Sequence, residues 1–120
     1  CKNKYLILGN HDHLFYHSKM LRSFFKRVDN YLEIKVKDPD ANRGYQKIIL
    51  FHFPILEWNA GHHGSWMWHG HTHGNLNYPP SLKNKKILDI GVDCHNYQLL
   101  SYQEGKALMK GRENITHHGE

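Results

Sequence analysis

The stretch Lys47-Ile48-Ile49-Leu50-Phe51-His52-Phe53-Pro54, taken with Trp66-Met67-Trp68-His69-Gly70-His71-Thr72-His73-Gly74, decides the fold. In each half, a short apolar run is followed by a polar loop that contains histidine. Apolar runs of this length are typical of strands that are buried on both faces of a sheet. The repeated order predicts an α/β fold, with the loops meeting at the edge of the sheet where the strands end.

The residues that precede this stretch predict further elements of the same fold. A buried strand is predicted at residues 5–8, and a helix from Ser18 to about Val28, because apolar residues recur there every three to four positions. Residues 31–37 alternate between polar and apolar side chains, which is typical of a half-buried strand. The turn-forming residues 38–44 then predict a hairpin with the strand at residues 47–53.

The residues that follow it predict two more strands and a helix. Strands are expected at residues 86–92 and 98–100. Ser101-Tyr102-Gln103-Glu104 has the pattern of a capping box and predicts a helix toward Arg112. Residues 113–120 are expected to form a flexible tail.

Composition limits the classes of protein to consider. A chain of 120 residues can bury the core of one domain, and no apolar run is long enough to span a bilayer. The two cysteines do not make a disulfide framework, so a cytoplasmic protein without a membrane partner is expected. The net charge of +5 favours anionic partners such as phosphate esters. The basic residues are scattered, so nucleic acid is only weakly supported as a partner.

Histidine is the unusual residue of this chain, with 12 in 120 residues. In Gly70–Gly74, two histidines two positions apart would point to opposite sides and suit two adjacent ions, although a histidine-rich surface loop is the alternative. In Gly9-Asn10-His11-Asp12, the amide oxygen of Asn10 is a ligand type that suits Mn, Zn, Fe or Ni together with imidazole. Asp12 could orient His11 and keep it protonated, or could simply cap a turn.

Taken in order, these motifs are far more specific than any one of them. Gly9-Asn10-His11-Asp12, then His52 at a strand end, then Gly70-His71-Thr72-His73-Gly74 resemble the third, fourth and fifth motifs of the calcineurin-like metallophosphoesterase superfamily. The resemblance is to its small bacterial and phage branch and covers about residues 4–112. It implies that residues 1–112 are the C-terminal part of a phosphoesterase domain, a partial β-sandwich flanked by helices that lacks the first strands.

The resemblance also implies a role for each motif residue. Asn10, His52 and His71 correspond to ligands of one metal ion, and His73 to a ligand of a second. His11 corresponds to the residue that contacts the phosphate and assists the leaving group, and Asp12 holds it. The implied activity is hydrolysis of a phosphomonoester or phosphodiester by a hydroxide that bridges two divalent ions, Mn above all, or Fe, Zn or Ni. The implied substrate is a phosphorylated small molecule or nucleotide.

The chain departs from the family in one respect. The family's first two motifs, Asp-x-His and Gly-Asp-x-x-Asp, precede the Gly-Asn-His-Asp strand, and this chain has no room for them before residue 5. The chain therefore looks like a segment of a longer polypeptide. Without the acidic ligands we expect at most one tightly bound ion, because two close divalent ions would repel each other.

Two further expectations follow from the missing motifs. The chain could be a truncated, non-catalytic module that binds metal or phosphate. A sheet that lacks its first strands would have an open edge, which favours self-association or a complementing N-terminal segment.

Other residues leave alternatives open. His62 and His63 could reach the phosphate or could lie in a solvated glycine-rich loop. His69 is expected to be structural, and packing is the expected role of the tryptophans. Asp93-Cys94-His95 has the composition of a metal triad, but is expected to be a strand end near the site.

Overall fold

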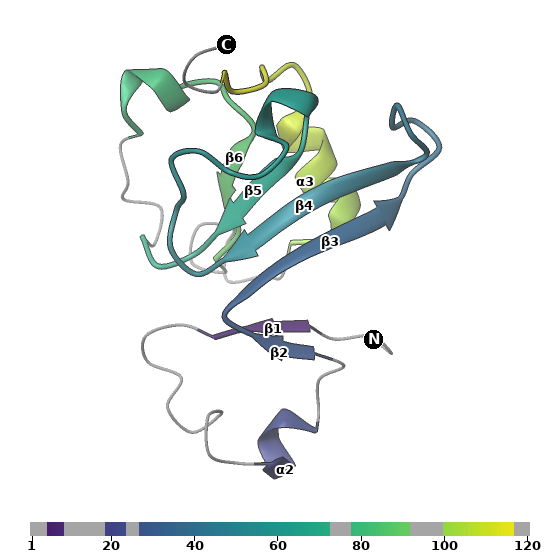
Figure 1. Cartoon of the computed structure of the whole chain (residues 1–120), viewed down its shortest axis with the longest axis vertical. Coiled ribbons are helices and arrows are strands. Elements are labelled where there is room, and N and C mark those ends of the chain that lie inside the picture. The colour runs from purple at the N-terminus through teal and green to yellow at the C-terminus, as the bar shows by residue number, and fades with distance from the viewer. Residues whose placement is uncertain (1–4, 9–18, 24–26, 73–77, 92–99, 117–120) are drawn as a thin grey trace.

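The computed structural model describes residues 5–8, 19–23, 27–72, 78–91 and 100–116, and these residues form a mixed α/β fold (Figure 1). Along the chain the elements are β1 (Tyr5–Ile7), α2 (Lys19–Arg22), β2 (Arg27–Asp29), β3 (Tyr31–Lys37), β4 (Tyr45–Phe51), the 3-10 turn η1 (Gly61–His63), β5 (Trp66–His69), the 3-10 turn η2 (Pro80–Leu82), β6 (Ile87–Asp89) and α3 (Tyr102–Met109). No helix among these residues is long and apolar enough to cross a membrane.

Four strands form one mixed sheet in the order β3-β4-β5-β6. The β3–β4 hairpin is antiparallel and runs from the pair Tyr31 and Phe51 to the pair Lys37 and Tyr45, as the alternating pattern and the turn residues predict. β4, β5 and β6 are parallel to one another. Their carboxyl ends therefore lie at the same edge of the sheet, which we call the carboxyl edge.

The sheet has a hydrophobic core on each face. Side chains of neighbouring strand residues point to opposite faces, so the apolar runs of β4, β5 and β6 supply both cores. One core contains Ile49, Met67, Ile87, Trp58, Leu82 and Ile115. The other contains Ile48, Trp66, Trp68, Leu88 and Met109. The continuous apolar runs thus correspond to strands that are buried on both faces.

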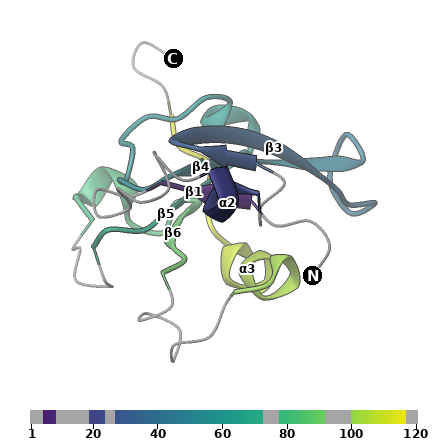
Figure 2. The same ribbon diagram turned by 90° about the horizontal axis from the view of Figure 1, so that it is seen from below.

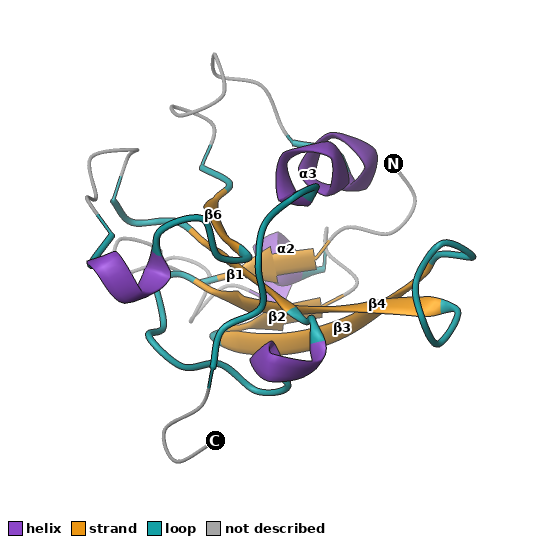
Figure 3. Cartoon of the chain, turned by 90° about the horizontal axis from the view of Figure 1, so that it is seen from above, coloured by secondary structure: helices purple, strands orange, loops and turns teal. Residues whose placement is uncertain are grey.

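Helix α3 lies on one face of the sheet, as Figures 2 and 3 show from opposite sides. Its capping box is present: Glu104 N–H donates to Ser101 Oγ, and Ser101 N–H donates to Glu104 Oε1, both at 3.1 Å. Tyr102 O–H donates to Asp38 Oδ2 at 2.6 Å, and Lys106 Nζ lies 2.8 Å from the same oxygen. These contacts hold α3 against the end of β3.

The predicted helix from Ser18 to Val28 is wrong in its second half. The described helix is only Lys19–Arg22, and Arg27–Asp29 is strand β2, which pairs in parallel with β1. Val28 lies opposite Leu6 in this pair. A β-branched residue that pairs with a neighbouring strand favours the extended conformation, so tertiary pairing overrides the helical spacing.

The remaining predicted bounds differ less. Strand β4 begins at Tyr45 and ends at Phe51, so His52 follows the strand. β6 covers only Ile87–Asp89 of the expected 86–92, and Leu100 is not in a strand. The tail expected from residue 113 is partly anchored, because Ile115 is buried in the core and Lys85 Nζ lies 3.1 Å from Glu113 Oε2.

Candidate metal centre at the carboxyl edge

His52 and His71 meet at the carboxyl edge of the sheet. His52 follows β4 directly, and His71 follows β5 after Gly70, whose N–H donates to the His52 carbonyl at 2.9 Å. A cavity of about 170 Å³ is lined by His52 and Gly70, and its lining also includes Ile7 at the end of β1. The end of β1 therefore lies at the same edge, beside the ends of β4 and β5 (Figure 1).

The two imidazole rings face each other through nitrogen atoms. His52 Nε2 lies 3.2 Å from His71 Nδ1, and the two rings are inclined at 73°. Two nitrogens that bind one tetrahedral zinc ion at 2.0–2.1 Å lie roughly 3.3 Å apart, so the observed separation fits two ligands of one ion. A hydrogen bond between two neutral rings has the same length. The separation of the two nitrogens is therefore compatible with a shared cation as well as with a hydrogen bond between the rings.

Phe53 forms a wall beside this pair of histidines. Its ring centroid lies 4.9 Å from that of His52 and 4.6 Å from that of His71. Phe53 is 39% exposed and contacts both imidazole rings from one side. Phe53 was not identified from the sequence, although it follows His52 directly.

The backbone at His71 has an unusual conformation. Its φ angle is +67°, in the left-handed region, and Thr72 N–H donates to the Gly70 carbonyl at 2.8 Å, which makes a three-residue γ-turn around His71. A non-glycine residue in this region costs of order 1–3 kcal/mol and is found most often at functional sites. The turn directs the imidazole back toward His52.

Asp89 holds the loop that carries His71. Its side chain is buried at the end of β6, where it accepts hydrogen bonds from Thr72 Oγ1 at 2.6 Å and from the Gly91 N–H at 2.8 Å. An acidic residue within the apolar run Ile87-Leu88-Asp89-Ile90 is the signal that could have identified it. Asp89 is therefore a positioning residue of this edge, and it was missed at the sequence level.

His69 is buried at the end of β5 and has the structural role that was expected. Its Nδ1 lies 2.9 Å from the Gly70 carbonyl and its Nε2 lies 2.6 Å from Tyr78 Oη. Burial lowers the pKa of His69, while the Gly70 carbonyl and Asp89 oppose that shift. The neutral ring can donate from Nδ1 to Gly70 and accept at Nε2 from the Tyr78 hydroxyl.

The structure locates only part of the predicted site. Asn10, His11, Asp12 and His73 lie outside the described residues, as does Asp93-Cys94-His95. Within the described part of the chain, no group of three His, Cys, Asp or Glu side chains is placed to hold an ion. His62 and His63 lie in η1, before the start of β5, and hence at the opposite edge from His71. They do not lie beside His52 and His71.

Comparison with known protein families, with curated proteins and with solved structures found no match to this chain.

Proposed function

We propose that the chain is part of a metal-dependent phosphoesterase of the calcineurin-like type. The observation that carries the proposal is the separation of 3.2 Å between His52 Nε2 and His71 Nδ1, at an edge where parallel strands end. The order of the sequence motifs supports the same site. The finer fold that we propose is the C-terminal part of a metallophosphoesterase β-sandwich.

In this proposal His52 and His71 hold one divalent ion together with Asn10, and His73 serves a second ion. Support for a role of Asn10 comes from β1, because Ile7 lines the cavity beside His52 and Asn10 follows Ile7 by three positions in the sequence. The ions would supply Lewis-acid chemistry and a water-derived nucleophile near neutral pH. Phe53 and Asp89 would keep the two imidazoles in position.

His11 and Asp12 are the proposed acid and its partner. A protonated imidazole beside the phosphate can stabilise the developing negative charge and give its proton to the leaving oxygen. A carboxylate next to that imidazole raises its pKa and keeps the proton available. The substrate class that fits these roles is a phosphorylated small molecule or nucleotide.

The proposed ligands limit how many ions these residues bind. One asparagine and three histidines are all neutral, so nothing in the set offsets the repulsion between two close divalent ions. We therefore propose one tight Mn²⁺ position in this chain. Additional acidic ligands would be needed for a second.

The test measures metal binding and hydrolysis on the same samples. Mn²⁺ binding is followed by calorimetry for the wild type, His52→Ala, His71→Ala and the control His62→Ala, whose ring lies at the opposite edge. We expect one site that is weakened at least tenfold by each of the first two changes and unaffected by the control. Two tightly bound ions per chain would contradict the proposal. So would a Mn²⁺ affinity of His71→Ala that equals that of the wild type.

Hydrolysis is followed with an aryl phosphate in the presence of Mn²⁺. Turnover that is lost in His71→Ala supports a phosphoesterase. The chain could instead bind Mn²⁺ without turnover, even after a segment that carries the acidic motifs is added. That result supports the non-catalytic module.

A further inference from the structure

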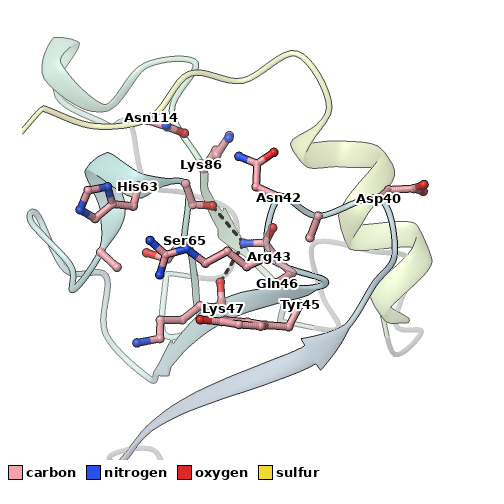
Figure 4. A pocket seen from close by; sticks show the side chains of 13 residues that line it. Asp40, Asn42, Arg43, Tyr45, Gln46, Lys47, His63, Ser65, Lys86 and Asn114 are labelled. Carbon is pink, nitrogen blue, oxygen red and sulfur yellow. Dashed lines mark hydrogen bonds between the residues drawn. The ribbon is translucent and has the colours of Figure 1, made fainter.

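A second pocket lies at the opposite edge of the sheet from the histidine pair. It has a volume of about 450 Å³ and is bounded by the β3–β4 turn, the start of β4, η1 and the segment before β6 (Figure 4). β4, β5 and β6 all begin at this edge, while His52 and His71 follow the ends of β4 and β5. The pocket is therefore separate from the proposed metal centre.

Polar side chains converge on the upper part of this pocket. Asn42, Lys86 and Asn114 all line it, as Figure 4 shows. A methyl group added at Gly64 would lie 3.6 Å from Asn114 Oδ1 and 3.8 Å from Lys86 Nζ, which places both groups beside the Gly64 backbone. The ammonium of Lys86 and the amide of Asn114 thus meet within a small volume.

The positive charges of the pocket are only partly compensated. Lys47 Nζ lies 3.4 Å from Glu33, and Asp40, which points away from the pocket in Figure 4, lies 2.9 Å from Lys106 Nζ. Within the described parts of the chain, Arg43 and Lys86 have no carboxylate within ion-pair distance. Lys86 is half-buried, and this burial lowers the pKa of its ammonium group.

One wall of the pocket is held by hydrogen bonds from the Gln46 side chain to backbone carbonyls. Gln46 Nε2 donates to the Gly64 carbonyl at 3.0 Å and to the Lys47 carbonyl at 2.9 Å, so the side chain joins β4 to the end of η1. Gly64 has a φ angle of +99°, a conformation that side chains rarely adopt. The Gly64 backbone that lies beside Lys86 therefore belongs to a braced turn.

We propose that this pocket binds the phosphate group of a small anionic molecule, with Arg43 and Lys86 as the charged ligands and Asn42 and Asn114 as amide donors. Two uncompensated cations match the charge of a phosphate near pH 7, which is about −2. The planar guanidinium of Arg43 suits two phosphate oxygens at once. A volume of about 450 Å³ leaves room for more than the phosphate itself.

The test uses pyrophosphate as the probe and metal-free protein, so that the proposed metal centre does not contribute. Binding is measured by calorimetry for the wild type, Lys86→Met, Arg43→Gln and the control Lys19→Met, which removes an exposed lysine of α2. We expect Lys86→Met and Arg43→Gln each to weaken binding about tenfold, and Lys19→Met to leave it within about twofold. His71→Ala should bind pyrophosphate like the wild type.

Three results would overturn the proposal. If Lys19→Met lost as much pyrophosphate affinity as Lys86→Met, the binding would be diffuse attraction to a basic surface. If only His71→Ala lost affinity, the anion would bind at the other edge. Succinate that binds as tightly as pyrophosphate would reject the phosphate class. Arg43 is exposed in a turn, so Arg43→Gln decides the outcome if Lys86→Met does not fold. Amide shifts of Gln46 and Gly64 on titration would support the location.

Discussion

Replacing Ile115 by alanine tests whether the end of the chain belongs to the core. Ile115 is only 4% exposed and packs in the same core as Trp58, on the face of the sheet opposite α3 (Figure 3). A methyl group added at Gly61 would lie 2.5 Å from Ile115 Cδ1. The side chain therefore sits directly on the backbone of η1.

The size of the effect follows from the atoms removed. The change deletes three buried carbon atoms, each worth about 0.8 kcal/mol of transfer free energy, which amounts to roughly 2.4 kcal/mol. Because η1 and the sheet are held by backbone hydrogen bonds, the cavity should close only in part and add to the loss. We expect a decrease of about 2.5–4 kcal/mol in the free energy of unfolding, and a decrease in Tm on the order of 10 °C.

The assay is urea and thermal unfolding followed by far-UV circular dichroism and tryptophan fluorescence. The control is Leu56→Ala, which removes a similar apolar side chain that is 60% exposed, and it should change stability by less than about 0.5 kcal/mol. An equally small effect of Ile115→Ala would refute the packing argument. In that case the segment from residue 113 would be the flexible tail that the sequence predicts.

Three further changes test other contacts. Gly105→Ala places a methyl group into the Trp68 ring. Although alanine favours helix, we expect the free energy of unfolding in urea to fall by about 1–2 kcal/mol. An increase in stability would contradict the packing of α3. Lys106 and the Tyr102 hydroxyl lower the pKa of Asp38 to about 2, so the stability that Asp38 contributes is complete above the unfolded pKa of about 3.9 and is lost as the pH falls toward 2. The difference in urea midpoint between the wild type and Asp38→Asn should accordingly narrow from pH 4 to pH 2, and a constant difference would argue against the shift. Asp89→Asn should lower Mn²⁺ affinity about 10–100-fold while the far-UV spectrum stays unchanged, and unchanged affinity would remove Asp89 from its positioning role.

The sheet could be predicted from the sequence because its signals are local. The alternation in residues 31–37 and the turn residues after it fix the hairpin with β4, and the apolar runs mark the strands that are buried on both faces. The pair of β1 and β2 could not be predicted in this way. Val28 lies at helical spacing from the apolar residues before it, and only its pairing with Leu6 selects the extended form.

The end of the chain shows a similar limit. A single isoleucine among polar residues gives no periodic signal, so residues 113–120 resemble a tail. The burial of Ile115 depends on the route that the chain takes after α3, past β6 to the face of the sheet opposite the helix (Figures 2 and 3). Contacts of this kind join residues more than 50 positions apart, as with Gly61 and Ile115, and no local pattern encodes them.

At the carboxyl edge, the sequence could predict which residues meet but not what holds them. His52 and His71 follow neighbouring strands, and parallel neighbours bring their ends to one edge, so their proximity follows from topology. The contacts of Phe53 and Asp89 follow from side-chain packing and from the φ angle of +67° at His71. Glycines flank this motif in the sequence, yet the described residue with a positive φ angle is the histidine His71. A strained histidine beside a loop that a buried carboxylate holds is better explained by a need for fixed ring geometry than by packing alone, because glycine could make the same turn at lower cost.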